Sequence, residues 1–198
     1  MSTKNAPIWA RIERQHARPL NDVFTADLIS AIAAEGNTAK GYALQAAQFY
    51  YGLGLPTKDH AQAFAAATRA AEADHPWGHF YAGVCLCLGQ GVEKDPVLGL
   101  QHLLLAANKG LLLAQHDVAM CHLFGIGTTI APTHGQAIMA CLADQGMLMS
   151  QFMLGWCLEH GHGCKENREE AIRLYQALAA NGLGHAIDRL TQLGVATP

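Results

Sequence analysis

Apolar residues recur four positions apart in short segments of the chain, as Ala82 and Leu86 do within residues 77–88. This spacing places their side chains on one face of an α-helix, because the helix turns once about every 3.6 residues. The same segment holds no proline and has small residues at Gly78 and Gly83. Small residues on a helix surface let another helix approach closely, so we predict a helix that packs tightly against its neighbours.

A Gly-x-Gly step follows this segment and occurs four times, with intervals of 37, 36 and 36 residues between the first glycines. Self-similarity at this period is typical of proteins built from stacked helical repeats. Glycine adopts the left-handed backbone conformation that ends many helices, so each step is expected to end a helix in a tight turn. The four steps are Gly52-Leu53-Gly54, Gly89-Gln90-Gly91, Gly125-Ile126-Gly127 and Gly161-His162-Gly163.

A second helix is predicted after each glycine step. Asp95 stands directly before Pro96, which places a capping side chain ahead of a proline at the first helical position. Asn167 holds the corresponding place in the last repeat, whereas Ala131-Pro132 keeps the proline and lacks the cap. These helices are predicted to end before three glycines that are again 36 residues apart, Gly110, Gly146 and Gly182.

The pattern predicts an all-α protein, a right-handed α-solenoid of stacked helix-turn-helix repeats. One repeat is too small to bury its own apolar side, so neighbouring repeats cover one another and half-repeats cover the ends. Residues 1–20 match no repeat and are predicted to form an N-terminal arm. The predicted single solenoid domain, 21–198, comprises a half-repeat (21–36), full repeats (37–75, 76–110, 111–146 and 147–182) and a C-terminal cap helix (183–198).

The composition narrows the kinds of partner. A net charge of −3 offers no basic surface for nucleic acid, and no stretch reaches the about 18 apolar residues that membrane insertion needs. Because no secretory signal is recognisable, the expected localisation is cytoplasmic. Apolar residues make up 51% and charged residues 15% of the chain, against about 25% charged in average domains, which favours a protein partner or a homo-oligomer.

Three of the six cysteines share one repeat position, since Cys85, Cys121 and Cys157 are 36 residues apart. Cysteine is a common small buried residue, and reduced thiols are usual in cytoplasmic proteins. We therefore expect these three side chains to pack in the core rather than to form disulfides.

The last full repeat carries a recognisable set of small and apolar residues: Ser150, Leu154-Gly155, Gly161-His162-Gly163, Asn167, Ala171, Ala179 and Gly182. On these residues the unit resembles the Sel-one-like repeat, a relative of the tetratricopeptide repeat. The chain departs from that family where the family has tyrosine, at Phe49, Leu86, His122 and Leu158. The resemblance implies a protein–protein interaction adaptor. Some members in bacterial toxin clusters look like immunity proteins, so the alternative is a cytoplasmic immunity protein that neutralises a secreted bacterial toxin.

The resemblance also implies where a partner binds, because related solenoids line a concave face with the first helix of each repeat. Opposite the core stripe of these helices lies a second stripe rich in aromatic and methionine side chains, which are favoured in interface cores. This stripe either forms a binding groove or packs against neighbouring repeats. The predicted partner-binding residues are Trp77, Tyr81, Val84, Asp117, Met120, Phe124, Met153, Trp156 and His160.

Chemistry beyond binding has little support in the sequence. His160, His162 and Cys164 could ligate a metal, but a structural zinc site needs four such ligands, so metal binding is kept only as an alternative function. The Gly-x-Gly steps follow helices and lack the third glycine of a nucleotide-binding loop. No nucleophile–base arrangement has a recognisable spacing, so we predict no enzymatic activity and no cofactor.

Overall fold

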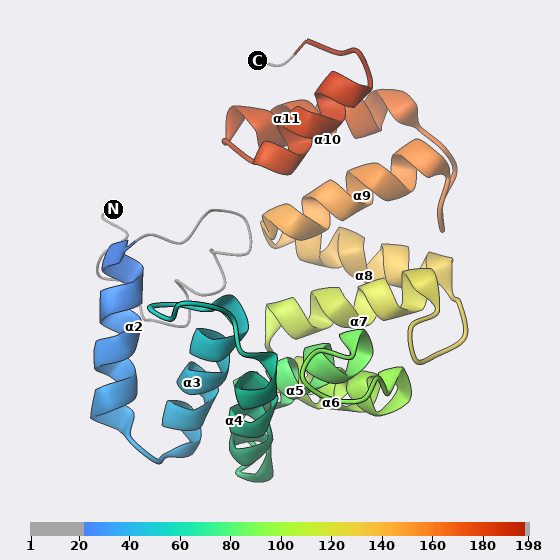
Figure 1. Ribbon diagram of the computed structural model, residues 1–198. Coiled ribbons are helices and arrows are strands. Elements are labelled where there is room, and N and C mark those ends of the chain that lie inside the picture. The colour runs from blue at the N-terminus through green and yellow to red at the C-terminus, as the bar shows by residue number, and fades with distance from the viewer. Residues whose placement is uncertain (1–21, 197–198) are drawn as a thin grey trace. The chain divides into compact units, whose positions relative to one another are not determined.

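The computed structural model describes residues 22–196, and this part of the chain is built from ten α-helices without a strand (Figure 1). The finding confirms the predicted all-α class, whereas the predicted N-terminal arm lies outside the described residues. None of these helices is long and apolar enough to span a bilayer. The helices are α2 (Asp22–Glu35), α3 (Ala39–Tyr51), α4 (His60–Glu72), α5 (Pro76–Leu88), α6 (Pro96–Asn108), α7 (Leu112–Phe124), α8 (Pro132–Asp144), α9 (Leu148–His160), α10 (Arg168–Ala180) and α11 (Gly184–Gln192).

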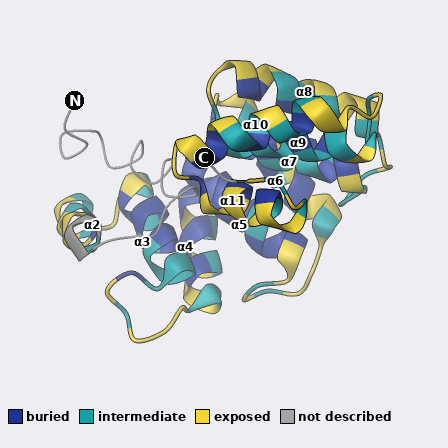
Figure 2. Cartoon of the chain, turned by 90° about the horizontal axis from the view of Figure 1, so that it is seen from above, coloured by how far each residue is buried: buried dark blue, intermediate teal, exposed yellow. Residues whose placement is uncertain are grey.

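The described residues divide into two compact units. The first comprises 22–118 and 126–128, and the second comprises 119–125 and 129–196. In the first unit α3 packs on α4, α4 on α5 and α5 on α6, so that consecutive helices are neighbours in space. In the second unit α8, α9, α10 and α11 follow the same rule. Figure 2 shows that most helices carry buried residues on one side and exposed residues on another, and that exposed residues also occupy the turns.

The first glycine of a Gly-x-Gly step ends a helix, as predicted. Gly52, Gly89 and Gly161 cap α3, α5 and α9 with left-handed φ angles of 74°, 71° and 63°. The amide of each glycine donates a hydrogen bond to the carbonyl four residues earlier in the helix it ends. Because side chains other than hydrogen disfavour this conformation, the turn needs glycine here.

The second glycine of the step has a different role. A Cβ atom on Gly91 would lie 2.2 Å from the His60 carbonyl oxygen, and one on Gly163 would lie 2.2 Å from the Pro132 carbonyl oxygen. Both contacts are with the first residue of the second helix of the preceding repeat. The glycine step therefore joins one repeat closely to the next, in addition to turning the chain.

Small residues form the predicted seam between the two helices of a repeat. A Cβ on Gly83 of α5 would come within 2.8 Å of both the Gly99 carbonyl oxygen and the Leu103 side chain of α6. The corresponding Gly155 of α9 faces the ring of Tyr175 in α10, 2.9 Å from the same hypothetical atom. Packing this close excludes larger side chains. The three cysteines at the shared repeat position, Cys85, Cys121 and Cys157, are buried in the core as predicted.

The predicted helix starts are also confirmed. Asp95 Oδ1 accepts a hydrogen bond from the Leu98 amide at 3.0 Å, and Asn167 Oδ1 accepts one from the Glu170 amide at 3.1 Å. Ala131 provides no side-chain cap for α8, which begins with Pro132. The proline removes one unpaired amide donor from the helix start and fixes a helical φ angle, so α8 starts without a cap.

Candidate partner-binding site

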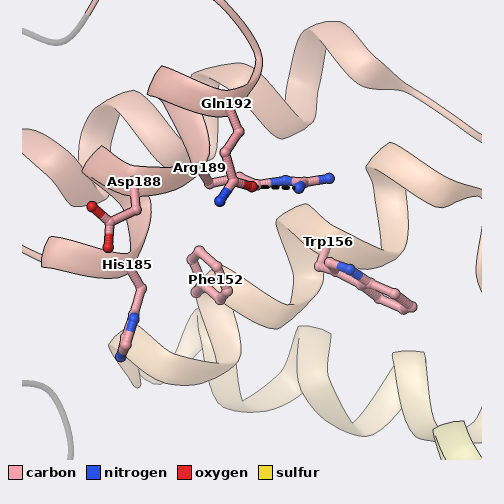
Figure 3. Close-up of a pocket in the computed structure, with 6 residues that line it drawn as sticks. All are labelled: Phe152, Trp156, His185, Asp188, Arg189 and Gln192. Atoms are coloured by element: carbon pink, nitrogen blue, oxygen red, sulfur yellow. Dashed lines mark hydrogen bonds between the residues drawn. The ribbon is translucent and has the colours of Figure 1, made fainter.

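An aromatic face of helix α9 characterises the surface of the second unit. Phe152, Trp156 and His160 follow one another at intervals of four residues and therefore lie on one side of the helix. Residues of α11 complete an open hollow of ≈ 320 Å³ beside them (Figure 3). This volume is close to the lower limit of about 300 Å³ for ligand pockets. The hollow is lined by Phe152, Trp156, His185, Asp188, Arg189 and Gln192.

Helix α11 has one buried and one exposed side. Ala186 and Leu190 are fully buried in a core cluster that also contains Tyr175 of α10. His185 and Asp188 lie on the exposed side, where they line the hollow. The packing of the apolar side thus fixes the polar residues of α11 next to the aromatic face of α9.

A charged pair holds one wall of the hollow in place. Arg189 donates from Nε and Nη2 to the two carboxylate oxygens of Glu159, at 3.0 and 2.5 Å, and from Nη1 to Gln192 Oε1 at 2.9 Å. Tyr175 Oη donates to the same carboxylate at 3.1 Å. Burial alone would raise the pKa of Glu159, but the hydrogen bonds from Arg189 and Tyr175 outweigh it and lower the pKa. The guanidinium is therefore already neutralised, so it is not a free anion site.

A cluster of four rings continues from the hollow. The ring of Trp156 stacks on His160 with 4.5 Å between centroids and contacts Phe124 at 5.5 Å. Phe124 stacks on His162 at 5.8 Å and is 41% exposed. His160 Nδ1 donates to the Trp156 carbonyl at 2.9 Å, which orients the imidazole against its own helix. Phe124 and His160 are exposed, whereas Trp156 and His162 are partly buried. Exposed aromatic rings are the kind of surface that a protein partner covers.

The structure brings three of the predicted binding residues of the second unit together, namely Phe124, Trp156 and His160. Met120, Met153 and Trp156 are partly buried and pack against a core cluster that contains Cys157. The predicted stripe therefore contributes both to the core and to the surface in this unit.

The predicted binding residues of the first unit are placed differently. Trp77 is 4% and Tyr81 0% exposed, and their rings stack with centroids 5.9 Å apart. Val84 and Asp117 are partly exposed. Burial of Trp77 and Tyr81 is what the packing alternative expects, and a binding role for the four residues stays a prediction.

The residues that suggested a metal site point in different directions. His162 Nε2 donates to the Leu123 carbonyl at 2.9 Å, while His160 contacts the Trp156 carbonyl. The Cys164 thiol lies 3.9 Å from the His162 carbonyl. Within residues 22–196, no group of three histidine, cysteine or acidic residues is arranged to hold a metal ion.

Sequence reasoning missed most of the hollow. Phe152 stands one helical turn before Trp156, so the spacing of four could have indicated it. His185, Asp188, Arg189 and Gln192 carried no comparable signal, because they belong to a terminal helix with no repeat partner for comparison. Only the structure shows that these side chains of α11 line a hollow together with Phe152 and Trp156 of α9 (Figure 3).

Comparison with known protein families identifies the repeat. The family model described as Sel1 repeat matches four consecutive segments, residues 40–75, 78–111, 112–147 and 148–183. The chain belongs to the Sel1 repeat family. Sel1 repeats are generally protein–protein interaction modules, and proteins with this fold are typically non-enzymatic adaptors.

Relatives of known structure share the helical repeat fold. A Sel1 repeat protein from Oxalobacter formigenes is 23% identical with a TM-score of 0.70, and the match covers 95% of this chain and 78% of that one. The protective antigen c5321 of uropathogenic Escherichia coli, which displays an SLR fold, is 25% identical with a TM-score of 0.61, covering 95% of this chain and 41% of that one. These likenesses are consistent with an α-solenoid and agree with the predicted fold class.

A curated relative comes from yeast. The chitin synthase regulator SKT5 of Saccharomyces cerevisiae is 32% identical over 101 residues, which are 50% of this chain. The matched part is only 14% of the yeast protein. What that protein does as a whole is therefore no more than a hypothesis for this chain.

Proposed function

We propose that this chain is a non-enzymatic adaptor that binds a protein partner on the partly exposed aromatic surface of its second unit. The observation that carries the proposal is the hollow between α9 and α11, with the stacked rings of Trp156 and His160 at its edge. Tryptophan is enriched among residues that dominate binding energy, because it offers a large rigid area for contact. Membership in a family of interaction modules supports the same conclusion.

The chemistry of the hollow indicates what the partner presents. Phe152 and Trp156 offer apolar walls, whereas the Arg189 charge is already satisfied by Glu159. An acidic ligand would therefore gain little, and an apolar side chain would gain most from leaving water here. His185, Asp188 and Gln192 form a polar rim, which suits the edge of a protein interface.

Co-purification from the native cell tests the proposal. The full chain is used as bait in wild-type form and as two variants, Trp156→Ala and Asp188→Arg. The larger arginine at the exposed position 188 would fill part of the hollow. One matched control is Val97→Ala, which shortens an apolar side chain that is 57% exposed in the first unit. The other is Asp144→Arg, a charge reversal at an exposed residue of α8. Captured proteins are identified by mass spectrometry, and circular dichroism checks the fold of each variant.

We expect one partner to be retained by the wild type and both controls and lost from both hollow variants. A partner that binds equally to all five proteins would show that the interface lies elsewhere. Loss from Trp156→Ala with retention by Asp188→Arg would show that the indole matters for folding rather than for contact.

Several finer hypotheses are distinguished by the same capture. Toxin neutralisation, an immunity function, requires a tight one-to-one complex with the product of an adjacent gene. A regulatory role toward an enzyme, as the name of the yeast relative suggests, requires capture of that enzyme. Self-association requires the chain's own sequence among the captured proteins and a doubled mass in light scattering. Fractionation of native cells tests the expected cytoplasmic location.

A further inference from the structure

Helix α6 of the first unit exposes more large apolar side chains than any other helix in the described part of the chain. Four of its side chains are between 39% and 57% exposed, namely Val97, Leu98, Leu104 and Leu105. Gln101 is also exposed and lies midway between them along the helix. We call these five residues the α6 stripe. Exposed apolar side chains that gather in one place often mark an interaction surface.

The corresponding positions in the other repeats hold small or polar residues. Helices α4, α8 and α10 begin at intervals of 36 residues with α6, so their residues can be compared one by one. In place of the four apolar residues, α4 has Ala61, Gln62, Thr68 and Arg69, α8 has Thr133, His134, Ala140 and Cys141, and α10 has Glu169, Glu170, Gln176 and Ala177. The repeat therefore folds without apolar side chains at these positions, and the α6 stripe needs another explanation.

The α6 stripe is arranged symmetrically about Gln101. Because an α-helix turns by about 100° per residue, Leu98 and Leu105 lie about 60° and 40° to one side of Gln101. Val97 and Leu104 lie about 40° and 60° to its other side. On each side, one residue precedes Gln101 and one follows it. The stripe therefore presents nearly the same surface when the direction of the helix is reversed.

A stripe with this symmetry is complementary to a second copy of itself. In an antiparallel pair of α6 helices with a two-fold axis at Gln101, the axis exchanges the start and the end of the helix but keeps its two sides. Leu98 of one copy then faces Leu105 of the other, and Val97 faces Leu104. The antiparallel arrangement also places the positive end of each helix dipole beside the negative end of the other.

The residue at the centre of the stripe suits a contact with its own copy. A side chain on a two-fold axis meets the same side chain of the other copy, so a charge at this place would repel itself. A glutamine amide both donates and accepts hydrogen bonds, so two copies can bond to each other. The equivalent residues are Ala65 in α4, Ala137 in α8 and Arg173 in α10. The α6 stripe itself contains no charged residue.

We propose that the α6 stripe is the contact surface of a homodimer, in which the α6 helices of two copies pack antiparallel with their Gln101 amides at the two-fold axis. This inference goes beyond the proposed function, because it involves the first unit and not the hollow between α9 and α11. One helix from each copy makes a small interface, so we expect a dissociation constant in the micromolar range.

Sedimentation equilibrium of the full chain at about 1 to 500 µM provides the test. The samples are the wild type, Gln101→Lys, Gln101→Glu and an equimolar mixture of these two variants. The matched control is Ala65→Lys, which places the same charge at the equivalent exposed position of α4. Circular dichroism checks the fold of each protein.

We expect the wild type and Ala65→Lys to reach twice the monomer mass as concentration rises. Each charged variant at position 101 should dimerise at least about 10-fold more weakly, because like charges meet at the axis. The mixture should dimerise again, since lysine then meets glutamate. This recovery also shows that both variants are folded.

A second mixture tests the direction of the helices. Leu98→Glu and Leu105→Arg each place a charge against an apolar side chain, so each variant alone should lose the dimer. Glutamate and arginine are the native residues at these positions in other repeats, as Glu170 and Arg69, so both suit the helix. Mixing the two variants should restore the dimer. Mixing Leu98→Glu with Val97→Arg should not, because these positions face each other only in a parallel pair.

A wild type that stays monomeric up to the highest concentration would overturn the inference, even if a different protein proved to bind the stripe. A dimer that tolerates both charges at position 101 would place the interface elsewhere, with the same consequence. Equal weakening by Ala65→Lys would reduce the effect to general charge repulsion and would also contradict the proposal. Recovery with Val97→Arg instead of Leu105→Arg would refute the antiparallel arrangement.

Discussion

Replacement of Asp117 by asparagine should stabilise the protein at neutral pH, because the partial burial of this carboxyl group disfavours its charged form and raises its pKa. The folded-state pKa of about 7 lies about three pH units above the ordinary carboxyl value of 3.8. Each unit corresponds to about 1.4 kcal/mol, so ionisation of Asp117 costs the folded state up to about 4 kcal/mol at pH 8. Asparagine has the same shape and never ionises, so the variant escapes this cost.

The stability of the wild type is expected to fall as pH rises through the acidic range. Below about pH 4 the carboxyl is protonated in the folded and unfolded states, so it contributes no difference. Between about pH 4 and 7 the unfolded chain ionises while the folded protein keeps the proton, so wild-type stability falls as pH rises. Above pH 7 both states are ionised and the cost is constant. Relative to Asp117→Asn, the wild type should lose about 2 to 3 kcal/mol between pH 5 and pH 7.

Urea unfolding of both proteins at pH 5, 6, 7 and 8, followed by circular dichroism, measures this difference. Other titrating groups are shared by the two proteins and cancel in the subtraction, and Glu72→Gln provides a control with an exposed carboxylate. Parallel stability profiles for wild type and Asp117→Asn would refute the argument, since they would mean that water or another group solvates the carboxylate in the folded state. A destabilised Asn variant would show that Asp117 accepts an essential hydrogen bond.

Three further predictions concern the turns, the charged pair and the aromatic surface. Gly163→Ala should lower the free energy of unfolding by at least about 3 kcal/mol, because the new Cβ would collide with the preceding repeat. Gly161→Ala should lower it by only about 1 to 2 kcal/mol, the strain of a left-handed backbone conformation. Thermal unfolding of both variants measures the difference. Glu159→Gln should lower the free energy of unfolding by about 3 kcal/mol, since it leaves the Arg189 guanidinium without its carboxylate. The double variant with Arg189→Met should regain part of this stability, which a double-mutant cycle measures. Trp156→Ala should weaken partner binding by at least about 2 kcal/mol, measured by calorimetry once the partner is captured.

The helices and turns could be predicted because their signals are local. Gly89 and Gly161 end their helices through a backbone conformation that glycine favours by itself, and Asp95 caps α6 through a bond to an amide three residues away. Repetition provided a second, independent indication, since the same residue types recur at the same interval. At these positions the prediction does not depend on where the neighbouring helices lie.

The site could be predicted only in part because it depends on how helices face one another. A stripe opposite the core could belong either to a groove or to a packed interface, and the structure contains both cases, with Trp77 buried and Phe124 exposed. The pairing of Glu159 with Arg189 joins residues 30 positions apart on different repeat elements, so no short motif announces it. The full burial of Tyr81 is likewise a property of its surroundings and not of its sequence.

The repeat explains how one position of the scaffold can carry chemically different side chains. Tyr81, Asp117 and Met153 stand 36 residues apart and so occupy one repeat position. Gly83 and Gly155, by contrast, hold positions at which a larger side chain would collide with the neighbouring helix. The scaffold therefore restricts the seam and leaves this other position free to vary. In the first unit this position holds Tyr81 and Asp117, which differ in charge and size, while in the second it holds the partly buried Met153.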